Sequence, residues 1–285
     1  MNHQAIRLQP GLHFVATPIG TARDITLRAL DVLASADVLA AEDTRSLRRL
    51  LEIHGVPLGD RPLLSYHDHS SAKVRGKLLA YLEDGQSVAY ASEAGTPLIA
   101  DPGYHLSVEA AEAGHLVTSA PGPSAIITAL TLAGLPTDAF FFAGFLPNAK
   151  GARRSGLEAV KDVPGTLVFY ESPHRIGDML SDASRVLGPD RKAVICRELT
   201  KKFEEVRRGT LGTLAEEISG TKLKGEIVVL VDRAALRETS DEDLEAALQS
   251  ALTTMSVRDA ADSVAKAYGA HKRSVYQMAI KLSGK

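Results

Sequence analysis

The segment SVAYASEAGTPLIADPG, residues 87–103, decides how the first half of the chain is organised. Its first five residues, SVAYA, are small, apolar and β-prone, which is typical of a strand buried on both faces. The loop that follows holds two Gly and two Pro beside Glu93 and Asp101. Because glycine permits close backbone approach and proline fixes φ, this loop is more constrained than a surface turn requires. We therefore expect it to hold a ligand.

Similar strand, loop and helix patterns recur on both sides of this segment. Short strand-like runs alternate with helical ones, which indicates a parallel sheet covered by helices on both faces. The expected strands are 12–16, 37–41, 62–66, 87–91 and 115–120, and the expected helices are 25–36, 46–55, 72–85, 105–114 and 124–134. We assign this first α/β domain to residues 1–135.

The rest of the chain has a different character. From residue 138 strands become more frequent, which indicates a second α/β domain with a mixed sheet over residues 136–236. Its expected strands are 138–145, 165–172, 191–199, 204–210 and 225–232, with helices at 173–187 and 211–218. The link between the domains is short, so they should touch and leave a cleft. Residues 237–285 predict a small helical domain that is helix-turn-helix-like around Gly269, with plain three-helix packing as the alternative.

Composition narrows the class of protein. The chain has 285 residues, of which 45% are apolar and 24% charged, as in globular proteins. Its one cysteine, Cys196, excludes an intramolecular disulfide or a Cys-rich zinc site and favours a reducing cytoplasm. We expect no membrane span and no signal segment, because long apolar runs are missing.

Charge gives a weaker indication. The net charge of −2 argues against general polyanion binding, but residues 256–285 hold six Lys and Arg against two Asp. That end suits nucleic acid about as well as it suits an ordinary solvated helix face.

Five loops follow the five strands expected in the first domain. In an open parallel sheet, ligands bind beyond the carboxyl ends of the strands, so these loops should converge on one site. They are 16–26, 41–46, 65–71, 91–103 and 119–130. The chain has no G-x-G-x-x-G, P-loop or G-x-S-x-G motif, which argues against a standard nucleotide fold or a serine hydrolase. For His67 and His69, a substrate contact or a hydrogen-bonded loop is favoured over a metal site, and we predict no metal.

Seven motifs in order carry a resemblance. VATPIGTARDITLRAL, AEDTR, YHDHS, SEAGTPLIADPG, PGPSAIITAL, FYESPHR and RELTKKFEEVRRGTL resemble the small-subunit ribosomal RNA methyltransferase I family over about residues 12–232. The resemblance implies an α/β, two-domain tetrapyrrole-methylase (class III methyltransferase) fold with a C-terminal helical domain. It further implies 2′-O-methylation of a cytidine in the decoding region of 16S ribosomal RNA, with S-adenosylmethionine as cofactor, by a cytoplasmic homodimer. Glu93 and Thr21 depart from the Asp and Asn that many relatives carry.

The resemblance also implies functional residues. The cofactor-binding residues it implies are Pro18, Glu93, Gly95, Thr96, Pro97, Ile99, Ser124, Ala125, Tyr170, Leu199, Gly225 and Glu226.

The candidates for RNA binding are Arg153, Arg154, Arg175, Lys201 and Lys202. Candidate general bases are Glu42, Asp43, His67, His69, Glu171 and Glu198, with His67 and Glu198 preferred as catalytic residues. The alternative for most of these acids is an ion pair with a neighbouring Arg or Lys.

Two other functions compete with this prediction. The first is a methylase of the same fold that acts on a small tetrapyrrole. The second is a DNA-binding regulator that senses S-adenosylmethionine and uses the last three helices without catalysis.

Overall fold

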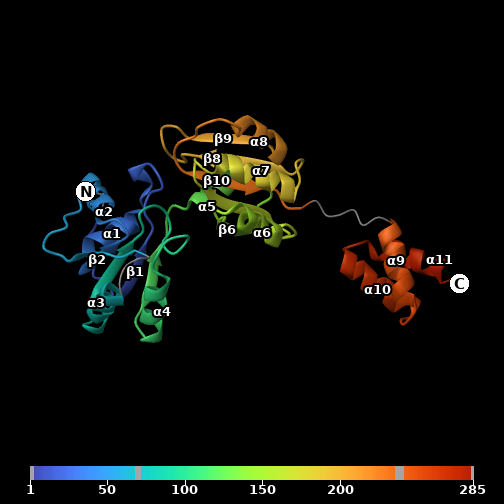
Figure 1. Ribbon diagram of the computed structural model, residues 1–285. Coiled ribbons are helices and arrows are strands. Elements are labelled where there is room, and N and C mark those ends of the chain that lie inside the picture. The colour runs from blue at the N-terminus through green and yellow to red at the C-terminus, as the bar shows by residue number, and fades with distance from the viewer. Residues whose placement is uncertain (1–2, 68–71, 235–240, 284–285) are drawn as a thin grey trace. The chain divides into compact units, whose positions relative to one another are not determined.

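A computed structural model describes residues 3–67, 72–234 and 241–283 (Figure 1). The chain divides into two compact units, Met1–Arg233 and Ala234–Lys285. Across the residues described, none of the helices has the length and apolar character that a bilayer span requires.

The first sheet is fully parallel. It contains β1 (Gly11–Val15), β2 (Val38–Ala41), β3 (Leu63–Ser65), β4 (Ser87–Ala91) and β5 (Val117–Ala120) in the order β3-β2-β4-β1-β5. All five strands lie where the sequence predicts them. The central β4, which opens the segment 87–103, is buried along its whole length.

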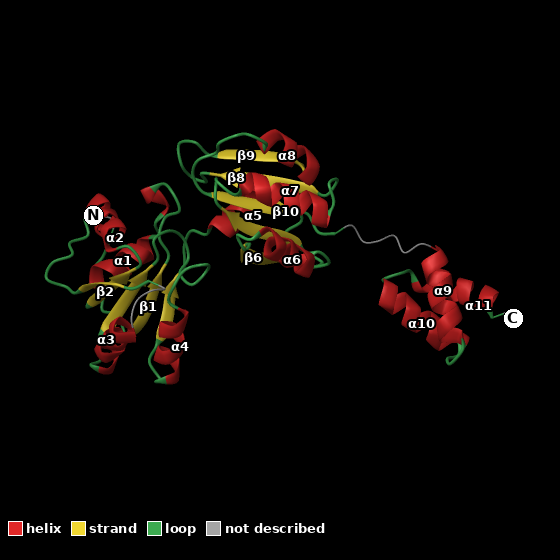
Figure 2. Cartoon of the chain, in the orientation of Figure 1, coloured by secondary structure: helices red, strands yellow, loops and turns green. Residues whose placement is uncertain are grey.

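Helices cover both faces of this sheet (Figure 2). Alternate residues of a strand point to opposite faces, so Leu39 and Ala41 pack with one pair of helices, and Val38 and Ala40 with the other. The first pair is α1 (Leu27–Ser35) and α2 (Thr44–His54), and the second is α3 (Ala72–Glu83) and α4 (Tyr104–Glu112). A short 3-10 helix, η1 (Ala22–Asp24), precedes α1.

The second sheet is mixed, as predicted. It contains β6 (Phe140–Phe145), β7 (Thr166–Glu171), β8 (Lys192–Arg197), β9 (Glu205–Thr210) and β10 (Ile227–Val231) in the order β6-β7-β10-β8-β9. Only the β6–β7 pair is parallel among these strands. One face is covered by α6 (Lys150–Val160), α7 (Ile176–Leu187) and α8 (Leu211–Ile218).

The opposite face of the second sheet is covered by α5 (Ala125–Ala133). Its Ile126 and Leu130 lie in one core cluster with Val168 and Val228 of that sheet. By packing, α5 therefore goes with the second sheet, although the boundary expected at 135/136 places it in the first domain. The same cluster includes Ile19 from the loop after β1, so it joins the two sheets.

Helix α6 was not among the helices predicted from the sequence. Two glycines, Gly151 and Gly156, lower its intrinsic helix propensity. Tertiary contacts stabilise it instead: Leu157 is buried, and Arg153 donates to Asp182 of α7 at 2.8 Å.

The second unit has its own core. Helices α9 (Asp241–Leu252), α10 (Val257–Tyr268) and α11 (Lys272–Leu282) bury a cluster that includes Leu248, Val264 and Val275. Gly269 ends α10 in the left-handed conformation that favours glycine, at φ 62°. Residues 235–240, which contain the expected boundary at 236/237, lie outside the described residues.

Candidate functional site

Three loops at the carboxyl edge of the first sheet are bonded to one another. Thr17 and Gly95 exchange backbone hydrogen bonds of 2.9 and 3.0 Å, and the Thr17 hydroxyl donates to the Ser92 carbonyl at 3.1 Å. The Thr96 hydroxyl donates to the carbonyl of Pro123, in the loop after β5, at 3.0 Å. The expected convergence of the loops after β1, β4 and β5 is thus present.

Two of the loops near this edge hold strained backbone. Leu98 and Ala100 have φ of 70° and 60°, and Glu198 and Thr200 have φ of 52° and 61°. Side chains other than glycine rarely adopt this region, and such strain concentrates at functional sites.

The strained 198–202 loop touches the loop after β1 at Gly20. A Cβ at that position would lie 2.4 Å from the Thr200 hydroxyl oxygen and 2.8 Å from the Leu199 carbonyl oxygen, so only glycine permits the contact. Beside it, the backbone N–H of Thr21 donates to the Thr200 hydroxyl at 3.2 Å. These contacts hold the two sheets together at the site.

A cavity of about 340 Å³ lies between the sheets, and we call it the inter-sheet cavity. Its volume is within the range of about 300–1,000 Å³ that is usual for small-ligand pockets. It is lined by Ile19, Ala94, Ala100, Asp101, Ala125, Phe145, Tyr170, Glu171, Ser172, Pro173, Leu199, Gly225, Glu226, Ile227 and Val228.

A second cavity of about 580 Å³, the α2 groove, lies on the other side of the bonded loops. It is lined by Thr17, Pro18, Gly20, Ala22, Asp43, Arg45, Ser46, Leu47, Arg49, Leu50, Ile53, Ser92 and Glu93. Successive residues alternate between the two cavities: Pro18 and Glu93 line the α2 groove, whereas Ile19 and Ala94 line the inter-sheet cavity. The Thr17–Gly95 pairing therefore forms a common wall between the two cavities.

The inter-sheet cavity combines an aromatic wall with carboxylates. The Tyr170 ring packs edge-on against Phe142 and Phe145, with centroids 4.9 and 5.6 Å apart. Burial raises the pKa of the Tyr170 hydroxyl to about 12, and the negative charges of Asp101 and Glu226 add to the shift. Such a cavity suits a flat aromatic group together with hydroxyl or ammonium groups.

The twelve residues implied as cofactor contacts fall into three sets. Ala125, Tyr170, Leu199, Gly225 and Glu226 line the inter-sheet cavity. Pro18 and Glu93 line the α2 groove. The remaining five line neither cavity, and they are Gly95, Thr96, Pro97, Ile99 and Ser124.

Several cavity residues were missed by sequence reasoning, among them Ile19, Phe145 and Val228. Each is near a predicted site residue or at the end of a predicted strand. Proximity in sequence was therefore the signal that could have found them.

Glu198 is held in an ion pair. Its carboxylate lies 3.0 Å from Lys201 Nζ and accepts from the backbone N–H of Glu226 at 3.1 Å. The hydrogen bond from Lys201 lowers the pKa of the Glu198 carboxyl, which makes it a weaker base. Its side chain also fills the space beside Gly225, where a Cβ would approach within 2.3 Å. This arrangement gives no support to Glu198 as a general base and favours a role in positioning the loop.

Glu171 is a buried residue in the lining of the inter-sheet cavity. One carboxylate oxygen accepts from the Ser172 backbone N–H at 2.7 Å and lies 3.2 Å from Arg175 Nε. Burial raises the pKa of this carboxyl above its ordinary value. Arg175 also donates to the Leu146 carbonyl, so the pair fixes the loop between β6 and α6.

The other candidate bases have less direct relations to the cavities. His67 lies two residues beyond β3, is partly buried and lines neither cavity. His69 lies outside the described residues. Asp43 caps α2, and its hydrogen bonds with Arg45 lower the pKa of the Asp43 carboxyl. The described residues contain no group of three His, Cys, Asp or Glu side chains that could hold a metal.

Four of the five predicted RNA-binding residues are engaged in ion pairs. Arg153 and Arg154 both contact Asp182, Arg175 contacts Glu171, and Lys201 contacts Glu198 and Glu226. With its side chain only 5% exposed, Arg153 is not accessible to a phosphate, which corrects that expectation. Lys202 is exposed and lies 5.5 Å from the centre of the Phe203 ring.

Comparison with solved structures defines the class of fold. The chain is similar to the methyltransferase CobJ, with TM-score 0.60 and 20% identity over 79% of this chain and 95% of that chain. It is also similar to a uroporphyrin-III C-methyl transferase from Thermus thermophilus complexed with S-adenyl homocysteine, with TM-score 0.55 and 16% identity over 79% and 98%. A family model described as Tetrapyrrole (Corrin/Porphyrin) Methylases matches residues 11–215. The tetrapyrrole-methylase fold predicted from the sequence is confirmed.

Sequence relatives are more specific. A Ribosomal RNA small subunit methyltransferase I from Mesorhizobium japonicum is 48% identical over 96% of this chain and 93% of its own length. One from Escherichia coli O157:H7 is 42% identical over 99% of both. A model described as RsmI C-terminal HTH domain matches residues 238–283. The chain belongs to the ribosomal RNA small subunit methyltransferase I family, which confirms the resemblance of the seven motifs.

Proposed function

We propose that this chain transfers a methyl group from S-adenosylmethionine to small-subunit ribosomal RNA, at the ribose 2′-hydroxyl of a cytidine in the decoding region. The observation that carries the proposal is the 42–48% identity, over nearly the whole chain, to relatives named Ribosomal RNA small subunit methyltransferase I. Small ribosomal subunits or their 16S RNA are the partner, and the cytoplasm is the location that the proposal requires.

The residues of the inter-sheet cavity fit the cofactor. Ile19, Leu199 and Val228 provide apolar surface for the adenine ring, while Asp101 and Glu226 suit the ribose hydroxyls and the ammonium group. S-adenosylmethionine supplies a methyl group already activated by its sulfonium. The carboxylates of the cavity favour that positive charge.

The chain must therefore align and deprotonate a ribose hydroxyl. Alignment of two reactants can contribute about 7–11 kcal/mol to lowering a barrier, and a positioned base about 10²–10⁴-fold in rate. The bonded loops around Thr17 and Gly95 provide the rigid frame for alignment. Glu198 and Lys201 hold the strained loop over the cavity, and His67 remains the predicted base.

The test is methyl transfer from labelled cofactor to unmethylated small subunits, with the labelled nucleotide mapped. We expect label on one cytidine ribose. We also expect Ala125→Phe, which places a ring in the inter-sheet cavity, to weaken cofactor binding at least about tenfold without unfolding the chain. Transfer to a corrinoid or porphyrinogen in place of subunits would support the tetrapyrrole rival. Cofactor-dependent binding of duplex DNA without turnover would support the regulator.

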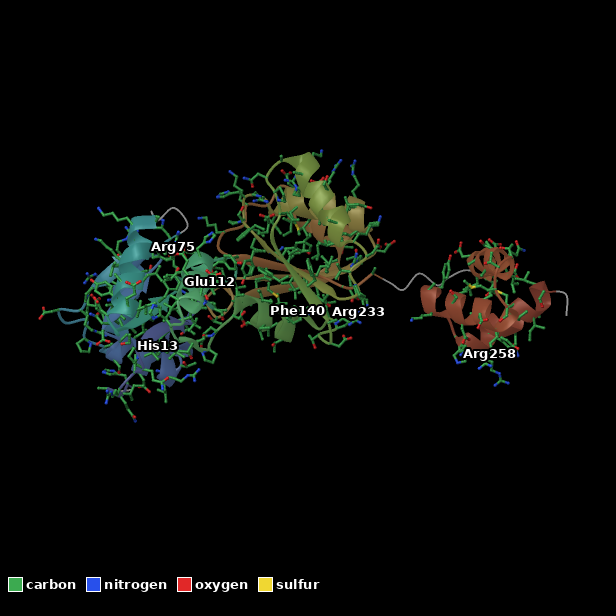
Figure 3. The ribbon with its side chains drawn as sticks, turned by 90° about the horizontal axis from the view of Figure 1, so that it is seen from below. His13, Arg75, Glu112, Phe140, Arg233 and Arg258 are labelled. Carbon is green, nitrogen blue, oxygen red and sulfur yellow. The ribbon has the colours of Figure 1, made fainter. Side chains whose placement is uncertain are left out.

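We further propose a homodimer that buries an apolar patch on β6 and α5. The strand β6 is an edge of the second sheet, and Phe140 and Ile127, which line one hollow beside α5, are exposed large hydrophobic residues. Figure 3 marks Phe140 and also Arg233, which pairs with Asp138 just before that strand. Exposed apolar groups at a sheet edge are typical of protein interfaces.

Phe140→Asp tests the homodimer by light scattering after gel filtration. We expect the wild type to have the mass of two chains and the variant that of one. Leu27→Asp, at an exposed leucine on α1, is the control and should stay dimeric. A monomeric wild type would contradict the proposal.

A further inference from the structure

Four of the five residues predicted to bind RNA leave little free charge for it, because they are held in ion pairs. The carboxylates that these residues contact are themselves partly or fully buried. If the cation left to bind RNA, a buried carboxylate would lose its partner, which is costly. The four cations are Arg153, Arg154, Arg175 and Lys201. A strand of RNA held near the cofactor needs basic side chains that can leave their carboxylate partners more easily.

The α2 groove offers such cations. Arg45, Arg49 and Ile53 follow one another at four-residue spacing, so they share the face of α2 that lines the groove. The side chains of Arg45 and Arg49 are 90% and 73% exposed.

Both arginines have capacity for a further partner. Arg45 binds Asp43 through Nε and one terminal nitrogen, at 3.3 and 3.0 Å, which leaves its other terminal nitrogen available in that pair. Arg49 makes one long contact, of 3.4 Å, to the exposed Glu52. Exposed pairs of this kind contribute little to stability and are easily exchanged for a phosphate.

The α2 groove adjoins the inter-sheet cavity. The two cavities share the Thr17–Gly95 wall, with Glu93 on one side and Ala94 on the other. Ile53, which is 51% exposed, adds an apolar surface against which a ribose or base can rest.

We infer that the α2 groove binds the single-stranded RNA next to the methylated nucleotide, with Arg45 and Arg49 contacting its phosphates. This inference rests on the proposed function and names the surface by which the RNA is held. It assigns RNA binding to the first sheet's domain, where the sequence analysis placed none of its RNA-binding candidates.

The test compares Arg49→Ala with Arg48→Ala in the full chain. Arg48 is an exposed arginine on the same helix that does not line the groove, so it matches the change in charge and in helix propensity. We measure KM and kcat for unmethylated small subunits at several salt concentrations, the dissociation constant for S-adenosylmethionine, and Tm.

For Arg49→Ala we expect KM for subunits to rise about tenfold, because one charge-assisted hydrogen bond to the RNA is lost. The slope of log binding against log salt should become shallower by about 0.7, as for one phosphate contact on a single strand. Cofactor affinity should stay unchanged, and Arg49→Lys should restore part of the loss.

Equal effects of Arg49→Ala and Arg48→Ala would overturn the inference, as would a loss of cofactor affinity in Arg49→Ala. Failure of the proposed function has a different signature, because the wild type itself would then transfer no methyl group to subunits.

Discussion

Glu171 shows how burial at a single residue sets a pH dependence. Its pKa is raised in the folded chain, so between the ordinary value of 4.5 and the raised value the folded state binds more protons than the unfolded state. Stability contributed by this group is therefore lost as pH rises through that window. Glu171→Gln keeps an acceptor for the Ser172 N–H but removes the charge. In thermal unfolding, we expect Tm of the variant relative to the wild type to be higher at pH 7 than at pH 4.

A difference in Tm that is the same at both pH values would show that Arg175 compensates fully for the burial of the carboxylate. Glu198→Gln is a useful comparison, since the pKa of Glu198 is lowered by Lys201. Its stabilising contribution is present above the ordinary pKa and is lost as pH falls, so its variant should show the opposite trend.

At the scale of elements, the strands were predictable and one helix was not. Strands such as β4 are buried throughout and mostly apolar because helices cover both faces of a parallel sheet, and that pattern is local in sequence. Helix α6 depends on the contact between Arg153 and Asp182, which are far apart in the chain. No local pattern in the sequence predicts this helix. For the same reason, Arg153 was predicted to be available to bind RNA.

The site was predictable as a set of loops but not as surfaces. Parallel strands bring their carboxyl ends to one edge, so the loops holding Pro18, Glu93 and Ser124 were expected to converge. Whether a residue faces one cavity or the other depends on the pairing of Thr17 with Gly95. That pairing places the neighbours Pro18 and Ile19 in different cavities, which sequence spacing alone does not determine.

At the scale of the whole molecule, both cavities belong to one of the two compact units. Every residue that lines the inter-sheet cavity and the α2 groove belongs to Met1–Arg233. The second unit has a separate core and carries Lys272, Arg273 and Lys281 on its last helix. We propose that cofactor binding resides in the first unit and that the second unit contacts the RNA substrate.

A chain ending at residue 234 tests that division. It keeps Arg233 and its ion pair with Asp138, so the second sheet's contacts remain intact. We expect its dissociation constant for S-adenosylmethionine, measured by calorimetry, to stay within about twofold of the full chain, a difference below 0.5 kcal/mol. Its KM for small subunits should rise, because the basic residues of α11 no longer contribute phosphate contacts. If the shortened chain instead loses cofactor affinity while keeping its Tm, the second unit must take part in forming the cofactor site.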